Sequence, residues 1–75
     1  MNEKRIRLSG TEEVRELVRE AEKCDFDIDI SYNRIIVDAK SFLGILAMDL
    51  SQTLTVTYCG SDSNFERVLQ RYAVA

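Results

Sequence analysis

The 75-residue sequence contains no histidine, and this absence narrows the chemistry open to it. Histidine is the side chain that most often moves protons near neutral pH. Its absence also excludes every serine or cysteine nucleophile that a histidine would activate. The three glycines, Gly10, Gly44 and Gly60, lie far apart, so the sequence has no glycine-rich loop for phosphates. The sequence therefore predicts a protein that is not an enzyme.

Metal and cofactor sites have equally little support. Cys24 and Cys59 are the only cysteines and do not form a C-x-x-C pair, which argues against a zinc site. We interpret both thiols as small, inert and partly buried. Asp27 and Asp29 have a spacing found in calcium loops, but the segment lacks the glycine and the closing glutamate of an EF-hand. We expect neither a metal nor a cofactor.

Long apolar runs and blocks of positive charge are also missing. No stretch approaches the roughly 20 apolar residues that span a bilayer, and the opening MNEKR lacks the apolar core of a signal peptide. The formal net charge is -3, with acids and bases interleaved. Nucleic-acid binders carry a basic patch or stripe instead, so we interpret Lys4, Arg5 and Arg7 as one solvated strand face. The sequence predicts a cytoplasmic protein that binds neither membranes nor nucleic acid.

The pattern that is present predicts a single α+β domain over residues 1–75. Strands are predicted where apolar and polar residues alternate, at 4–8, 26–32, 35–37 and 53–59. Helices are predicted where apolar residues recur every three or four positions, at 12–23, 42–48 and 65–72. Strands that are apolar on one face only favour an antiparallel sheet. The expected fold is a two-layer open-faced β-sandwich of order β-α-β-β-α-β-α, with a four-stranded antiparallel sheet covered on one face by helices.

Capping residues predict where two of the helices begin. Ser9 and Glu12 have the spacing of a capping box before the first helix. Ser41 stands directly before the second helix, where a serine is a frequent N-cap. This second helix has apolar residues nearly all round. One short helix over a small sheet cannot bury its whole circumference, so we expect at least one of Phe42, Leu43 and Leu46 to be exposed.

Residues 32–46, YNRIIVDAKSFLGIL, place a hairpin with Tyr-Asn before Lys40-Ser41 and a short apolar helix that contains Gly44. A strand that closes on Gly60, and a helix after it, follow. This arrangement resembles the HPr family, the histidine-containing phosphocarriers of the sugar phosphotransferase system. The resemblance covers the chain from Lys4 onward, and it implies the same open-faced sandwich that the alternation predicts.

The start of the first helix departs from that family. Family members carry a phosphoryl group on a histidine in a Gly-x-His-x-Arg-Pro run. Counting back from the central match places Gly10 at the histidine position, Glu12 at the arginine and Glu13 at the proline. A carboxylate in place of the arginine would repel a phosphoryl group. The chain is therefore similar to family members that lack the histidine, such as the catabolite-repression HPr-like protein.

The resemblance also implies a regulatory role for Ser41. In HPr proteins of Gram-positive bacteria a kinase phosphorylates the serine at this position, and the product binds a regulator of sugar metabolism. By resemblance, HPr kinase or such a regulator is the expected protein partner, and Phe42, Leu43 and Leu46 form the patch that contacts it. The residues alone support a plainer interpretation, in which Ser41 is only an N-cap and the patch belongs to the core.

Two functional hypotheses follow. In the first, the chain is a non-catalytic regulatory or adaptor protein of the sugar phosphotransferase system type, unable to carry phosphohistidine and switched at Ser41. In the second, it is a structural or homo-oligomeric interaction module that only inherited the HPr fold. Such a module would form a homodimer through the open sheet face or an edge strand.

Overall fold

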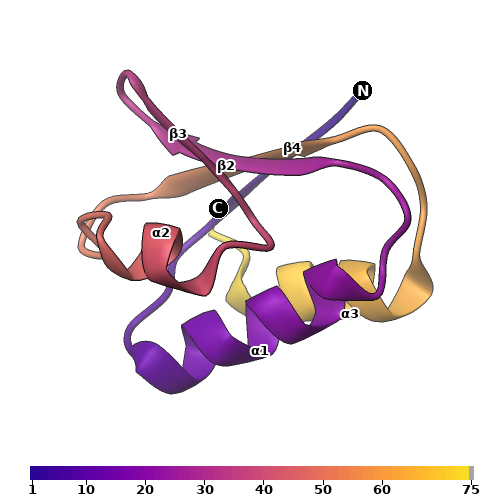
Figure 1. The fold of residues 1–75 in the computed structure, drawn as a ribbon, viewed down its shortest axis with the longest axis horizontal. Helices are drawn as coiled ribbons and strands as arrows, with labels where there is room; N and C mark the ends of the chain where they lie inside the picture. Colours follow the sequence, from indigo (N-terminus) through magenta and orange to yellow (C-terminus); the bar gives the residue numbers. More distant parts are fainter. Residues whose placement is uncertain (75) are drawn as a thin grey trace.

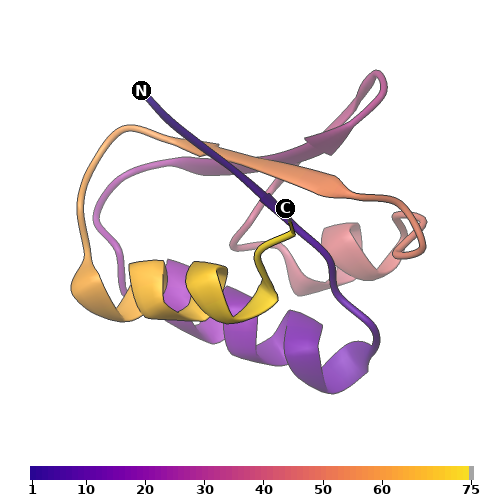
Figure 2. The same cartoon turned by 180° about the vertical axis from the view of Figure 1, so that it is seen from behind.

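The computed structural model describes residues 1–74 and has the predicted order of elements. The strands are β1 (Asn2–Ile6), β2 (Ile28–Tyr32), β3 (Ile35–Asp38) and β4 (Leu54–Tyr58). The helices are α1 (Thr11–Glu22), α2 (Phe42–Leu46) and α3 (Ser63–Tyr72). The strands form one antiparallel sheet of order β1-β4-β2-β3, and the helices lie on one side of it (Figures 1 and 2). The two-layer open-faced sandwich is confirmed.

Over residues 1–74, no helix is long and apolar enough to cross a membrane.

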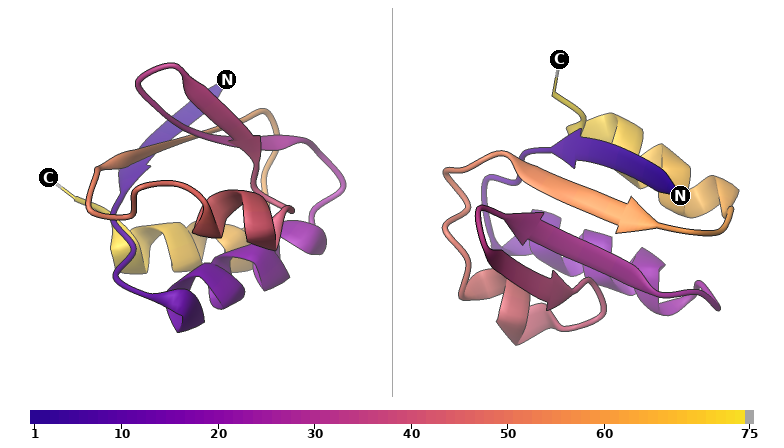
Figure 3. Two further views of the ribbon diagram at one scale, coloured as in Figure 1. Left: turned by 60° about the vertical axis from the view of Figure 1, so that its left-hand side comes forward. Right: turned by 90° about the horizontal axis from the view of Figure 1, so that it is seen from above.

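The sheet has a buried face and an open face, as its alternation predicts. In β4 the side chains of Leu54, Val56 and Tyr58 are buried, whereas Thr55 and Thr57 lie on the other face. Because residues that pair across an antiparallel ladder point to the same side, the other strands share this division. The helices cover the buried face, and the open face faces solvent (Figure 3, left).

The two longer helices bury the stripes that their spacing predicts. The buried residues of α1 are Val14, Leu17, Val18 and Ala21, and those of α3 are Phe65, Val68 and Leu69. The ring of Tyr58 packs against Phe65 in a T-shaped arrangement, with ring centroids 5.4 Å apart. The Tyr58 hydroxyl donates a hydrogen bond to Glu66, and burial together with this bond raises the pKa of Tyr58. The one polar group of this aromatic cluster thus has a partner.

A carboxylate on α1 ties that helix to the end of α3. The Glu16 carboxylate accepts hydrogen bonds from the Tyr72 hydroxyl and the Arg71 guanidinium. Both bonds, the one from Tyr72 foremost, lower the pKa of Glu16. The contact is partly exposed, so its contribution to stability is that of a surface network rather than of a buried pair.

The first strand lies two residues earlier than the alternation predicts. We expected a strand at 4–8, whereas β1 is Asn2–Ile6. Beyond Ile6 the backbone pairs with the end of α3, because Arg7 N–H donates to the Tyr72 carbonyl at 2.9 Å. Leu8 is still buried. The alternation therefore predicted correctly which side chains are buried, but not which backbone groups pair with β4.

The predicted capping box at Ser9 and Glu12 is wrong by one position. The N-cap of α1 is Gly10, which has no side chain to cap the helix. The carboxylate of Glu13, three residues later, accepts a hydrogen bond from the Ser9 backbone N–H at 2.8 Å. Glu13 thus bonds the residue before the N-cap, and among the described residues neither of the two bonds of a capping box forms at α1.

The cysteines differ from each other, contrary to our interpretation of both as partly buried. Cys24 is buried, and this burial raises the pKa of its thiol. Cys59 is exposed. It follows Tyr58, whose side chain points into the core. The alternation of the strand therefore directs the Cys59 side chain outward.

Candidate functional site

Ser41 is the N-cap of α2, as its position before an apolar run predicts. Its hydroxyl oxygen accepts a hydrogen bond from the Gly44 backbone N–H at 3.2 Å, and its own N–H donates to the Asp38 carbonyl at 2.9 Å. The residue is exposed. The hydroxyl is therefore held at a fixed place on the surface by the first turn of the helix.

Gly44 allows α2 to lie close to both Ser41 and β3. A Cβ atom at position 44 would lie 2.9 Å from Ser41 Oγ and 3.6 Å from the Cβ of Val37 in β3. The first distance is shorter than van der Waals contact, so any side chain there would displace the hydroxyl from its capping position. The place of the Ser41 hydroxyl depends on a glycine three residues later.

The predicted apolar patch on α2 is only partly open. Leu43 is 77% exposed, which confirms that at least one patch residue faces solvent. Phe42 and Leu46 are half-buried against the core cluster. The guanidinium of Arg15, on α1, lies over the Phe42 ring, 5.2 Å from its centroid, in a cation–π arrangement. Figure 3 (left) shows α2 alongside α1, where this contact forms.

The start of α1, where the resemblance places the missing histidine, is open but acidic. The backbone of Gly10 is extended, with φ of -178°, and a Cβ added there would meet nothing within 4 Å. Glu12 and Glu13 occupy the first turn. Glu12 pairs with Arg15 at 3.7 Å, and Glu13 bonds Ser9. Steric freedom is thus available at position 10, but the nearby side chains repel an oxyanion.

A feature that the sequence analysis missed is the loop after α2. The Asp49 carboxylate accepts hydrogen bonds from the Ser51 hydroxyl at 2.6 Å and the Ser51 backbone N–H at 3.0 Å, and these bonds lower the pKa of Asp49. The Asp49 backbone N–H donates to the Tyr32 hydroxyl at 3.1 Å. The Asp-x-Ser spacing is typical of such a turn. We interpret the loop as a support for the end of α2.

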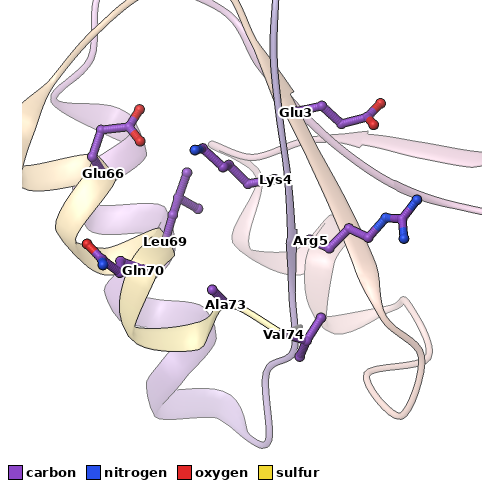
Figure 4. Close-up of a pocket in the computed structure, with 8 residues that line it drawn as sticks. All are labelled: Glu3, Lys4, Arg5, Glu66, Leu69, Gln70, Ala73 and Val74. Carbon is purple, nitrogen blue, oxygen red and sulfur yellow. The ribbon is translucent and has the colours of Figure 1, made fainter.

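A groove between β1 and α3 was also missed. It has a volume of about 550 Å³ and is lined by Glu3, Lys4, Arg5, Glu66, Leu69, Gln70, Ala73 and Val74. Figure 4 shows Lys4 extending from β1 toward α3. Side chains of both charges line the groove, so it favours neither an anion nor a cation. Within residues 1–74, no three potential metal ligands lie together.

Comparisons with known proteins show which fold the chain has. No protein-family model matches the chain, and no curated protein matches it. Among solved structures, it is similar to the phosphocarrier protein HPr from Bacillus anthracis. The identity is 27%, the match covers 95% of each chain, and the TM-score is 0.70. The chain has the HPr fold. The order of strands and helices that the alternation predicts is the order of HPr, and the likeness extends over nearly the whole of both chains.

The capping role of Ser41 is open to a direct test of stability. Ser41→Ala should lower the free energy of unfolding by about 1 kcal/mol, because the Gly44 N–H loses its partner. Ser41→Asp should keep the cap, and its charge near the helix start should add about 0.3–1 kcal/mol. Thermal melts of the three proteins at low salt would measure both effects. A Ser41→Asp protein that melts clearly below the wild type would contradict the prediction.

Proposed function

We propose that this chain is an HPr-like regulatory or adaptor protein of the sugar phosphotransferase system type, which acts without carrying a phosphohistidine. It acts in the cytoplasm by docking on partner proteins through α2, and phosphorylation of Ser41 switches this docking. The likeness to HPr supports the carrier-related part, and the absence of histidine supports the non-catalytic part. The observation that carries the proposal is one surface on which the exposed Ser41 hydroxyl precedes Leu43, itself 77% exposed.

The proposed switch acts through the surface rather than through refolding. A kinase would transfer the γ-phosphoryl group of ATP to Ser41 Oγ, with loss of the hydroxyl proton and release of ADP. The phosphate would add a charge of about -1.5 to -2 at neutral pH beside the unpaired N–H groups of the first turn. Such a group is tolerated at a helix start. The new charge would then lie next to Leu43, so the phosphorylated and unphosphorylated surfaces would bind different partner proteins.

The test is incubation of the chain with HPr kinase and ATP, followed by mass spectrometry. We expect one added phosphate, located by fragmentation on Ser41, and none on a Ser41→Ala variant. A regulator of sugar metabolism should then bind the phosphorylated form, and Leu43→Ser should weaken that binding without loss of phosphorylation. Absence of the phosphate on the wild type, or its persistence on Ser41→Ala, would overturn the proposal.

A further inference from the structure

Exposed apolar side chains gather on two neighbouring elements at one edge of the sheet. Apart from Met1, the large hydrophobic residues exposed within residues 1–74 are Ile35 (44%), Ile36 (68%) and Leu43 (77%). The first two belong to β3, the edge strand, and the third to α2, which packs against β3. Edge strands are usually protected by charged residues or proline at such positions. An apolar edge is therefore a candidate for pairing with another strand.

The backbone of β3 has free hydrogen-bonding groups at Ile36. Ala39 N–H donates to the Ile28 carbonyl at 2.9 Å, which fixes the odd-numbered residues as those that face β2. Pairing alternates along an antiparallel ladder, and Ile36 lies opposite Ser31. The N–H and C=O of Ile36 consequently point away from β2, toward solvent. They present the pair of groups that an added antiparallel strand would meet.

On the helix side of this edge, α2 presents an apolar surface, here called the shelf, which is formed by Leu43 and Ala47. Its Gly44 lies against Val37 of β3, and its Ile45 is buried in the core. With about 3.6 residues per turn, Leu43 and Ala47 then lie together on the side away from the core. Both are exposed. In Figure 3 (right), α2 extends past β3 at the margin of the sheet, so a strand beside β3 would rest on it.

Charges on the open face of β3 define what such a strand must carry. Ile36 and Asp38 are two residues apart in β3 and so share a face. Arg34 is the last residue of the turn that leads into the strand. Asp38 lies directly opposite Asp29 of β2, and like charges so placed repel each other. Within residues 1–74, none of the ion pairs involves Arg34, Asp29 or Asp38. One end of the edge therefore favours a cation and the other an anion.

We propose that the edge of β3 binds an extended segment of a partner protein as an additional antiparallel strand. The segment carries a basic residue opposite Asp38, a β-branched apolar residue opposite Ile36 and an acidic residue opposite Arg34. Its intervening side chains are apolar and rest on Leu43 and Ala47. This inference rests on the proposed function and deepens it, because it states the chemistry of the partner that docks on α2.

A second copy of the chain fits this edge less well than a foreign strand. Two copies joined through β3 in a continuous sheet would have their helices on the same side, related by a two-fold axis. Because α2 extends past β3 (Figure 3, right), the two α2 helices would meet near that axis. A single extended segment has no helix to collide with the shelf.

The probe is the blocked heptapeptide Thr-Lys-Leu-Val-Leu-Glu-Thr, titrated into the ¹⁵N-labelled chain and followed by NMR. We expect a saturable shift of the Ile36 amide and slower exchange of its hydrogen. A peptide N-methylated at the central valine should bind about tenfold more weakly or worse, because the bond to the Ile36 carbonyl is lost. N-methylation at the leucine after the valine should leave binding unchanged, because that N–H points away from β3. The charge-exchanged peptide Thr-Glu-Leu-Val-Leu-Lys-Thr should also bind more weakly.

Several results would overturn strand addition. These are no saturable shift of the Ile36 amide, equal binding of the two N-methylated peptides, or equal binding of the charge-exchanged peptide. A shift of Ile36 that follows the concentration of the chain alone would assign the edge to a second copy instead. The titration uses neither a kinase nor a phosphate on Ser41. Its failure would therefore leave the phosphorylation result standing, and failure of phosphorylation would leave the titration standing.

Discussion

Incubation with phosphoenolpyruvate and the general phosphotransferase enzyme is expected to leave no acid-labile phosphate on this chain. The sequence has no histidine to accept it, and Glu12 and Glu13 occupy the first turn of α1. Intact-mass measurement before and after mild acid treatment would detect the phosphorylated species. HPr from Bacillus anthracis, incubated in parallel, is the control for the assay. An acid-labile phosphate on this chain would contradict the prediction.

A histidine alone should not restore transfer. At Gly10 the backbone is extended and a Cβ would meet nothing within 4 Å, so Gly10→His should fold without strain. The obstacle is electrostatic, because the carboxylates of Glu12 and Glu13 repel the incoming phosphoryl group. Gly10→His combined with Glu12→Arg should therefore accept more phosphate than Gly10→His by itself. Equal transfer to the single and double variants would show that the acids do not matter.

The elements with strong periodicity were predictable, because burial of one face requires apolar residues at regular positions in the sequence. The stripe of α1 and the alternation of β4 report directly which side chains face the core. Backbone pairing between strands requires no such pattern of residues. Whether β1 ends at Ile6 or at Leu8 depends on the position of Tyr72. Its carbonyl accepts the hydrogen bond from the Arg7 backbone N–H that a longer β1 would have donated to a neighbouring strand. That contact joins residues far apart in the sequence, so no local sequence pattern predicts it.

The candidate site shows the same division. The capping role of Ser41 follows from its place before an apolar helix and was predictable. The exposure of at least one patch residue was also predictable, because a small sheet cannot cover the whole circumference of α2. Which residue it is did not follow. Leu43 is exposed, whereas Phe42 is half-buried, packed against the core with Arg15 of α1 over its ring. This depends on how two helices pack.

The region beside Gly60 shows where the packing tolerates no addition. A Cβ at position 60 would lie within 2.7 Å of three atoms of the Phe26 ring. That ring stacks on Tyr58, with centroids 6.0 Å apart, and Tyr58 in turn packs against Phe65. The Gly60 carbonyl also accepts a hydrogen bond from the Asn2 side chain at 3.0 Å. With the backbone held in this way, the Phe26 ring is the part that must move.

Gly60→Ala is therefore expected to lower the free energy of unfolding by about 1–3 kcal/mol, through displacement of Phe26 from Tyr58. This is a large share of the roughly 5–15 kcal/mol that stabilises a typical domain. No glycine among residues 1–74 has a positive φ, so the cost arises from the contact and not from backbone strain. Gly10→Ala, where the added methyl meets open space, is the matched control and should change stability by less than about 1 kcal/mol.

Chemical denaturation of both variants would measure the difference, and a double-mutant cycle would assign its cause. In a Phe26→Ala background the ring is absent, so Gly60→Ala should cost much less than it does in the wild type. The coupling should be at least about 0.5 kcal/mol, as for residues in direct contact. If Gly60→Ala costs the same with and without the Phe26 ring, the crowding at this position is not the reason that a glycine is needed there.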